Sequence, residues 1–516
     1  MPANEPNRNW KFMLAESDDM TPIGWLKYAR DKKLDLALNK PGSASFRMNV
    51  TDAMAAEIHG YDVKRCVIAY CDDENGVPTA RWSGPIWTSN ISLPSETLTV
   101  NCVGWYELLN KRELRTEAQF DGLDAGEIAR RIIRDANSTT YLINLLDNWS
   151  FEGGDYGFTN TNYTTVDRYS AWSTIGSHSL QLVAPNGMTS TLDSGEVTIS
   201  SSTAYTAALD VNVTSIGSGT VRLDVLWYNS SHVLLSTSSS STKSTSGETR
   251  LSVTATSPST AAYAVFRIRT NVTSSGITVL VDNAILVAGS STGITETPID
   301  IGTVATSQNR DVTFQQSTKH GAAIDQLVNI EAGFDWYIDP LTREFSVLYG
   351  AVKGTVFGRG TDRTDVEFHY GWGAKNVSGV ELPVDGSILA NRINAKGKYD
   401  TGVAYDEASI ATYGLFEEST ALSDVVDAET LVAYAGAEVA YKLQPFATYS
   451  FQPFPYDGTE RVPLFFEDYD IGDIVYLTVK YGCVEVERQA VRIFGTSIDI
   501  DMEGNERIGT IQTVAS

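Results

Sequence analysis

The strongest constraint on the fold is an abrupt change of composition in the middle of the chain. Between residues 143 and 292 lysine and arginine almost disappear while serine and threonine dominate, and every residue from Ser236 to Ser246 except Lys243 is Ser or Thr. Strand-like apolar alternation nevertheless continues through this region, for example over 221–228. The pattern predicts a self-contained all-β domain inserted into a chain of different character.

The sequence before the insertion predicts strands followed by one helix. Short β-branched or aromatic stretches, separated by turn residues, occupy 66–70, 80–87 and 96–105. Asp124 is a good N-cap residue, and Glu127 three positions later forms a capping-box-like pair with it. Because the following apolar residues share one face, we expect a helix that ends near Asn137.

The sequence after the insertion returns to the earlier character. A second helix is expected over 322–330, stopped by Gly333, and a hairpin over 334–350 that turns at Asp339 and Pro340. The helices before and after the insertion would then belong to one split domain. A longer helical pattern begins after Asp427 and runs to Pro445, and three alternating strands follow at 473–479, 484–495 and 506–514.

These patterns predict a mainly β protein with some α+β structure. A chain of 516 residues has room for about three to four domains. We expect a β domain at 1–120, an α+β domain split into 121–142 and 293–365, the inserted domain at 143–292, and a second β domain with one long helix at 366–516.

The net charge of the chain disfavours nucleic acids and anionic membranes as general partners. Lys and Arg number 39 and Asp and Glu 64, so the net charge is 39 − 64 = −25. A chain this acidic binds nucleic-acid phosphates or anionic membranes poorly. We find no apolar run of about 18 residues and no signal peptide in the polar start MPANEPNRNW, so we expect no membrane span and a protein kept in a cytoplasm or released by lysis.

Motifs for metal or nucleophilic chemistry are not found. The five histidines show no zinc-ligand spacing, and no nucleophile elbow or phosphate-binding loop occurs. Paired carboxylates carry little information among 64 acidic residues. We expect Cys66, Cys71, Cys102 and Cys483 to be small buried thiols.

Aromatic residues of the insertion are the more informative feature. Sugars stack on exposed aromatic faces bordered by amides and hydroxyls. Trp227 is in phase with the apolar residues of its strand, so we expect it in the core. Tyr169, Trp172 and Tyr228 are the freer candidates for binding a glycan. The open alternative is a spacer domain that packs against neighbouring proteins, since interfaces are also rich in aromatics.

The insertion resembles the jelly-roll carbohydrate-binding modules. It opens with NLLDNWSFEGGDYGF (144–158), continues with GSHSLQL (176–182) and closes with TVLVDNAILV (278–287). The resemblance covers the whole insertion and implies a β jelly roll. It also implies that Glu152 and Asp282 hold a structural calcium, a hard cation that carboxylates from both chain ends would bind. For Glu152 a surface carboxylate without metal is the open alternative.

The flanks resemble the baseplate-hub or tail-tip minor tail proteins of long-tailed, siphovirus-type phages. Five stretches carry this resemblance in the expected order: DLALNKPGSASFRM (35–48), LDAGEIARRIIRDA (123–136), AAIDQLVNIEAGFDWYIDPLTREFSV (322–347), SILANRINAKG (387–397) and YDIGDIVYL (469–477). The resemblance implies a homotrimeric hub with two small β-barrel domains per chain, joined to the tail tube or distal tail protein and to other tail-tip proteins. Many such proteins lack an insertion, so the role of the module does not follow from the hub.

The combined expectation is a structural virion protein at the tail tip, assembled in the host cytoplasm and without enzymatic activity. The inserted module would contact a host cell-wall glycan, and the genome would pass through the channel without specific binding. Two alternatives remain open: a carbohydrate-active enzyme with a sugar-binding module, and a lytic hub whose flanks cut peptidoglycan.

Overall fold

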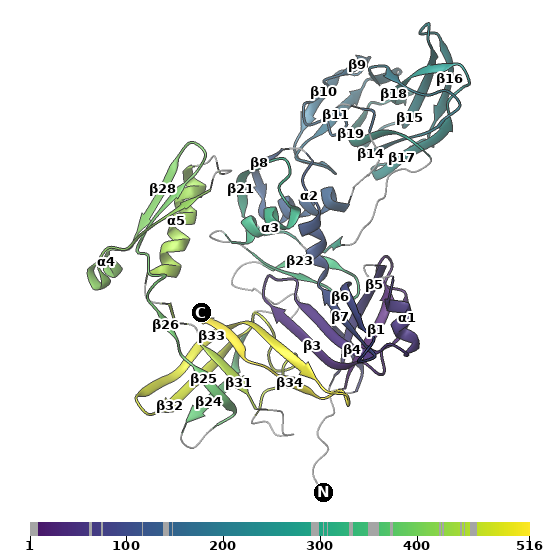
Figure 1. The fold of residues 1–516 in the computed structure, drawn as a ribbon. Coiled ribbons are helices and arrows are strands. Elements are labelled where there is room, and N and C mark those ends of the chain that lie inside the picture. Colours follow the sequence, from purple (N-terminus) through teal and green to yellow (C-terminus); the bar gives the residue numbers. More distant parts are fainter. Residues whose placement is uncertain are drawn as a thin grey trace.

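The computed structural model describes residues 9–60, 64–73, 76–115, 117–137, 144–146, 148–289, 299–302, 304–306, 308–329, 334–348, 361–371, 375–422, 425, 428–443, 446–447, 449–454 and 462–515. The protein is mainly β, as predicted. Figure 1 shows the inserted residues at one end of the molecule and the first and last strands of the chain together at the other. The expected boundaries at 142/143 and 292/293 lie outside the described residues.

A 14-stranded sheet unites the N-terminal and C-terminal parts of the chain. Its N-terminal strands are β1 (Trp10–Glu16), β2 (Pro22–Trp25), β3 (Arg30–Ala37), β4 (Ser43–Asn49), β5 (Arg65–Asp72), β6 (Pro78–Ser92) and β7 (Thr97–Val103). Its C-terminal strands are β24 (Asp362–Gly371), β25 (Val377–Glu381), β31 (Ser450–Pro453), β32 (Ile474–Tyr481), β33 (Val484–Ile500), β34 (Glu506–Ile508) and β35 (Ile511–Ala515). Helix α1 (Ala53–Ile58) lies between β4 and β5.

The two β-barrel domains expected from the flanks share this sheet. Strand β33 pairs with β32 through its first half and with β3 through its second half, where Lys32 is opposite Ile500 and Ala37 opposite Gly495. In the described strands the order runs from β2 to β25 without closing into a ring. A core that includes Phe46 and Phe451 is common to both halves.

The split domain forms from chain segments on both sides of the insertion. Before the insertion it contains the 3-10 helix η2 (Trp105–Lys111), β8 (Ala118–Asp124) and α2 (Ala125–Asn137). After the insertion it contains β20 (Asp300–Ile301), β21 (Asn309–Phe314), α3 (His320–Val328), β22 (Asp335–Ile338) and β23 (Glu344–Leu348). Strand β8 pairs with β21, and α2 packs against α3, so the expected helices and hairpin share one core.

Helix α2 begins at the expected N-cap. Asp124 Oδ1 accepts hydrogen bonds from the backbone N–H groups of Gly126 (2.9 Å) and Glu127 (3.2 Å). Its Oδ2 accepts from the N–H and hydroxyl of Thr306, both at 3.0 Å. Glu127 pairs instead with Arg130 and Arg131 of its own helix. The cap therefore also ties the helix to the chain that returns from the insertion.

The inserted module consists of two antiparallel sheets. One has the order β10-β11-β19-β14-β17 and the other β16-β15-β18-β12-β9, with β13 paired to β18. The strands are β9 (Phe158–Thr161), β10 (Thr165–Tyr169), β11 (Ser179–Ala184), β12 (Thr189–Ser194), β13 (Val197–Thr198), β14 (Ala204–Ile216), β15 (Gly219–Asn229), β16 (Leu234–Ser239), β17 (Gly247–Thr256), β18 (Ala261–Val272) and β19 (Ile277–Ala288). Their inward residues form one apolar core of the module.

The long helix expected near the C-terminus is α5 (Ala428–Lys442); its expected ends at Asp427 and Pro445 lie outside the described residues. It packs on a small sheet with a core of its own, which includes Ile393, Leu431 and Ala435. This small α/β unit contains β27 (Arg392–Lys396), β28 (Thr401–Tyr405), α4 (Glu407–Tyr413) and β29 (Glu417–Ala421). The two-residue strands β26 (Val384–Asp385) and β30 (Phe446–Ala447) pair at its base.

Three of the four cysteines are buried as expected, and the expectation for Cys483 is wrong because this residue is exposed. It lies in the turn between β32 and β33, where a hairpin tip has no core to cover it. Burial raises the pKa of the Cys66 thiol to about 12. In the described residues no helix is long and apolar enough to cross a membrane.

Candidate functional site

The structure separates the aromatic candidates of the inserted module. Trp227 lies in the module core with 1 % of its surface exposed, as predicted, and its indole N–H donates to Ser238 Oγ at 3.0 Å. Tyr228 is half-buried on the opposite side of the same strand, β15. Tyr169 is also half-buried but ends β10, which belongs to the other sheet. The expected glycan residues therefore do not share one sheet.

Trp172 is not a free aromatic ring, so the expectation of an exposed side chain is wrong. Only 6 % of its surface is exposed, and its indole N–H donates to Glu248 Oε1 at 2.9 Å. The Glu248 carboxylate also lies 3.6 Å from Arg134 of helix α2. Trp172 is buried because it lies where the module contacts the split domain.

A polar surface with two tyrosines covers the outer side of the β15–β18 sheet. Val221, Leu223, Val225 and Trp227 of β15 enter the core, so the residues between them point outward. Tyr228 is directly opposite Tyr263 of β18. We call this surface the tyrosine–arginine face; it consists of Tyr228, Tyr263, Arg222, Asp224, Arg267, Arg269 and Asp193. The buried outward pair Leu226 and Val265 separates its tyrosines from its charged residues.

The two tyrosines stand at one end of the tyrosine–arginine face. One side of the Tyr263 ring stacks on His232, with 4.8 Å between centroids and 11° between planes. His232 Nδ1 in turn lies 2.5 Å from Glu196 Oε2. This stack holds the Tyr263 ring in place. Both tyrosine rings are half-buried, so part of each surface remains available to a ligand.

Farther along the strands, the tyrosine–arginine face contains two arginine–aspartate ion pairs. Arg267 donates to both oxygens of Asp193, at 2.6 and 2.5 Å, and this carboxylate raises the pKa of Arg267. Asp224, 1 % exposed, lies beneath the face with Arg222 Nε 2.9 Å from its Oδ1. Aromatic rings and fixed charges on one surface are the groups that orient a polar ligand with C–H surfaces.

Sequence reasoning missed Tyr263, Arg267 and Asp193. The signal that could have found Arg267 is the alternation over 264–270, which sets Phe266 and Ile268 on one side of the strand and Arg267 on the other. Strand β18 lies between β15 and β12, and this order brings Tyr263 beside Tyr228. The order of strands in a sheet depends on the tertiary structure.

Glu152 and Asp282, expected to hold calcium, instead bind one loop of the module. Glu152 Oε1 accepts from the N–H groups of Ser177 (2.8 Å) and His178 (2.9 Å). Asp282 Oδ2 accepts from the N–H groups of Thr174 (2.6 Å) and Ile175 (2.8 Å). Both carboxylates thus face donors, whereas calcium requires a cage of oxygen acceptors.

The donor set at these two carboxylates does not fit calcium. Among the described residues no three His, Cys, Asp or Glu side chains are grouped to hold a metal. Gly176 has a φ of +62° and a Cβ there would come within 2.2 Å of Glu152 Oε1, so a glycine is required for this loop to wrap the carboxylate. Burial raises the pKa of Asp282, and the N–H groups of Ile175 and Thr174 oppose that rise.

Asp282→Ala tests the role of this carboxylate. The substitution leaves the N–H groups of Thr174 and Ile175 without their acceptor, and an unsatisfied buried group costs about 1–3 kcal/mol. We expect the module to lose about 3 kcal/mol of stability in denaturant unfolding. Asp282→Asn should lose less, since its amide oxygen can still accept. The wild-type melting temperature should not change with EDTA; a clear fall on chelation would contradict the N–H assignment.

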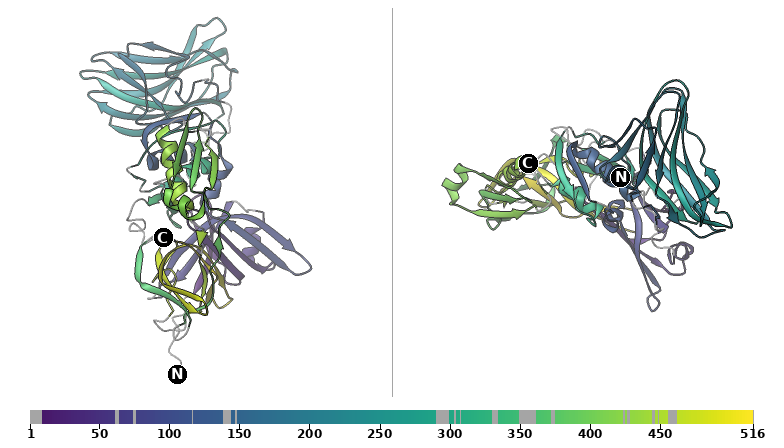
Figure 2. Two further views of the ribbon diagram at one scale, coloured as in Figure 1. Left: turned by 90° about the vertical axis from the view of Figure 1, so that its left-hand side faces the viewer. Right: turned by 90° about the horizontal axis from the view of Figure 1, so that it is seen from above.

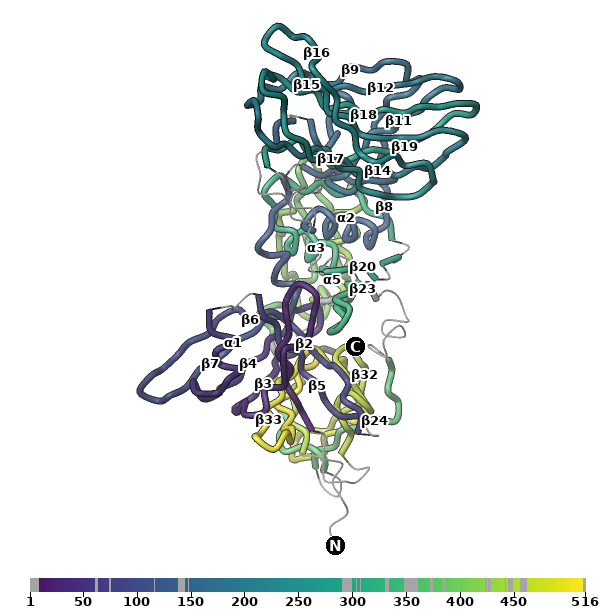
Figure 3. Tube along the Cα trace, turned by 90° about the vertical axis from the view of Figure 1, so that its right-hand side faces the viewer, coloured from purple at the N-terminus to yellow at the C-terminus, as the bar shows by residue number. Residues whose placement is uncertain are grey.

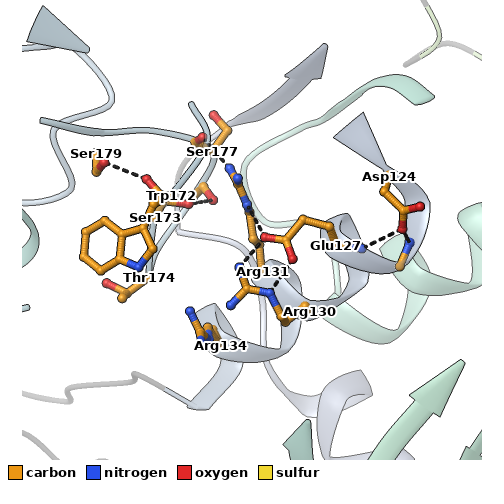
Figure 4. Close-up of polar contacts among 12 residues, drawn as sticks. Asp124, Glu127, Arg130, Arg131, Arg134, Trp172, Ser173, Thr174, Ser177 and Ser179 are labelled. Carbon is orange, nitrogen blue, oxygen red and sulfur yellow. Dashed lines mark hydrogen bonds and ion pairs between the residues drawn. The ribbon is translucent and has the colours of Figure 1, made fainter. Parts of the chain in front are cut away.

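The same loop contacts the split domain through helix α2. Arg131 Nη1 donates to the carbonyl of Ser177 at 3.0 Å, and Arg131 Nε lies 3.1 Å from Glu127. Arg131 is 1 % exposed. Figure 4 shows Arg131 and Arg134 of α2 reaching toward the loop that carries Trp172 and Ser177. We call this contact the module joint.

On each side of the module joint, hydrogen bonds join the chain segment that enters the module to the segment that returns from it. On the side of the split domain, Asn137 Nδ2 donates to the carbonyl of Ile299 at 2.7 Å. On the side of the module, the N–H of Leu145 donates to Leu286 and that of Ala284 to Trp149, both at 2.8 Å. Figure 3 shows the module stacked on α2 and α3, with the large sheet below them. The contacts that cross from the split domain to the module, and so set its orientation, are Arg131 to Ser177 and Arg134 to Glu248.

Arg131→Met tests whether the module joint sets that orientation. The substitution keeps the aliphatic stem but removes the donor to Ser177 and leaves Glu127 with fewer partners. We expect a broader pair-distance distribution in small-angle X-ray scattering. Arg130→Met is the matched control, because Arg130 pairs with Glu127 within the helix. Identical scattering from both variants and the wild type would show that Arg131 is dispensable.

Comparisons with known proteins give distant similarities. No protein-family model matches the chain, and no curated protein matches it. The tail protein from Neisseria meningitidis MC58 is 7% identical over 98% of this chain and 96% of its own, with a TM-score of 0.42. Family 16 Carbohydrate Binding Module-2 is 17% identical over 28% of this chain and 99% of its own, with a TM-score of 0.24.

A third similar structure is the enzymatically active domain of tailspike protein 4 of bacteriophage CBA120. It is 12% identical over 28% of this chain and has a TM-score of 0.24. The match spans only 22% of that chain. TM-scores of this size do not establish a shared fold, and identities this low do not transfer a function.

Proposed function

We propose that this protein is a structural component of a phage tail tip, in which the flanking domains form the hub and the inserted module contacts a glycan of the host surface. The five sequence stretches of the flanks support the hub role. The module joint supports a module presented in one orientation. The role is structural and not enzymatic.

The tyrosine–arginine face carries the proposal for the module. It combines two half-buried tyrosine rings, directly opposite each other across β15 and β18, with ion-paired arginines that begin beyond the next outward pair, Leu226 and Val265. Aromatic rings offer a surface to the C–H groups of a sugar, while charged groups can bind its polar substituents. The face also lies on the β15–β18 sheet, whereas Trp172 at the module joint lies beside the other sheet.

Combined Tyr228→Ala and Tyr263→Ala substitutions test this role. Loss of two stacking rings should weaken binding of the full-length protein to host cell walls by about tenfold or more in a pull-down titration. Tyr399→Ala is the control, because it removes a ring that is 76% exposed on the small α/β unit. Tyr169→Ala tests the candidate on the other sheet separately.

Two outcomes would contradict the assignment of glycan binding to the tyrosine–arginine face. Wild-type protein that does not bind host walls would remove it altogether. Binding unchanged in the double tyrosine variant but lost in Tyr169→Ala would move the contact to the other sheet. Reducing sugar released from those walls by the purified protein would instead indicate an enzyme.

We also propose that the hub is a homotrimer around a channel for the genome, next to the tail tube or distal tail protein. The net charge of −25 favours such a channel, because acidic walls repel DNA phosphates and keep the passing genome from binding. Static light scattering should give three times the mass of one chain in a buffer of virion-like ionic strength. A monomer at high protein concentration would contradict the trimer.

A further inference from the structure

Basic residues are unevenly distributed over the inserted module. Only six Lys or Arg residues occur between 143 and 292, and three of them, Arg222, Arg267 and Arg269, belong to the tyrosine–arginine face. Arg222 is directly opposite Arg269 across two paired strands, and Arg267 is at the next outward position of β18. A protein with a net charge of −25 therefore carries a local concentration of positive charge at the surface proposed to bind the glycan.

The carboxylates of the face neutralise only part of this charge. Arg267 is directly opposite Asp224 on one side and Asp193 on the other, and it binds Asp193 through two hydrogen bonds. Arg222 pairs with Asp224 along its own strand. Both acidic residues are thus already engaged by an arginine.

Arg269 differs from the other two arginines of the face because, among the described residues, no carboxylate is directly opposite it or paired with it. It is directly opposite Arg222 on one side and Thr191 on the other, so its nearest carboxylates in the register are diagonal. Within the part of the chain that the structure describes, its side chain has no ion-pair partner, and it is half-buried. Like charges directly opposite each other in a sheet are destabilising, so this arginine pair would be stabilised by an anion.

We propose that the tyrosine–arginine face binds an acidic polymer, whose carboxylate or phosphate groups engage Arg269 and Arg222 while neighbouring units lie against Tyr228 and Tyr263. This inference rests on the proposed glycan contact and names the chemical class of its ligand. The guanidinium group is suited to this task, because it binds carboxylate and phosphate oxygens through two parallel hydrogen bonds.

The spacing of the two ends of the face indicates the size of the ligand. Tyr263 and Arg269 are six residues apart on one strand, which corresponds to roughly 20 Å at about 3.3 Å per residue. One monosaccharide does not span that distance. A ligand that contacts the tyrosines and the arginine pair at once is therefore an oligomer with regularly placed negative charges.

The overall charge of the protein makes this binding selective. A polyanion is repelled by most of a surface with a net charge of −25 and is attracted where an arginine, here Arg269, has no carboxylate partner among the described residues. Binding should weaken as salt concentration rises, since the arginines are partly exposed and their charges are screened.

Affinity electrophoresis of the full-length protein tests the proposal. Native gels would contain polygalacturonate, its fully methyl-esterified form, or poly(glycerol phosphate). Acid and ester share one sugar backbone and differ by the charge and one methyl group per unit. The third gel tests phosphate in place of carboxylate. We expect at least about tenfold tighter binding to one of the two polyanions than to the ester.

Arg269→Gln should reduce this preference to about twofold or less, and Arg269→Lys should keep part of it, because the charge remains. Arg168→Gln is the matched control, since it removes one positive charge from β10 on the other sheet and should leave the preference unchanged. Melting temperatures of the three variants would show that each remains folded.

The outcomes separate this inference from the proposed function. Equal binding to acid and ester, or a preference unaffected by Arg269→Gln, would overturn the acidic-ligand inference while the glycan role stands. Lack of binding in all three gels, with host walls still bound through Tyr228 and Tyr263, would also overturn it. Failure to bind host walls would instead remove the proposed function itself.

Discussion

The pairing of β8 with β21 is the contact on which the architecture depends, because it joins chain segments that lie on either side of the whole inserted module. Asp124, at the end of β8, caps α2 and also accepts two hydrogen bonds from Thr306. Asn137, at the end of α2, reaches Ile299. The chain thus leaves the split domain and returns to it at neighbouring points, the geometry in which a large insertion is tolerated.

Helix α2 contacts both α3 of the split domain and a loop of the inserted module. Toward the interior, Asp135 Oδ2 lies 2.6 Å from His320 Nε2, and this buried pair holds α2 on α3. Toward the module, Arg131 donates to Ser177. The loop that receives this hydrogen bond is itself held by Glu152 and Asp282. Because each group has its partner in a different element, the orientation of the module follows from the packing of the helix. The two views of Figure 2 show the module projecting away from the large sheet.

The two sheets of the module share one core, but different sheets lie next to the module joint and carry the tyrosine–arginine face. The inner surfaces form the core that contains Trp227, while loop residues beside the β10–β19 sheet, Trp172 among them, form the module joint. The outer surface of the β15–β18 sheet carries the tyrosine–arginine face. Attachment and proposed ligand contact are therefore made by different sheets, so that binding does not compete with the joint.

Local patterns in the sequence determined much of the structure. Alternation over 221–228 placed Trp227 in the core, Asp124 marked the start of α2, and the loss of basic residues marked the inserted module. Each of these signals is local, because a strand or helix with one apolar side must bury that side whatever its partner is.

Only the tertiary structure decided which strands pair and which side chains form hydrogen bonds with each other. The pairing of β3 with β33 merged the two expected barrels into one sheet, and Glu248 and Arg134 made Trp172 a buried residue of the module joint. Glu152 and Asp282 matched a calcium motif in sequence but meet N–H donors in the fold. Periodicity tells which side of an element is apolar, whereas hydrogen-bond partners come from residues far apart in the chain, and their choice depends on the packing of the whole molecule.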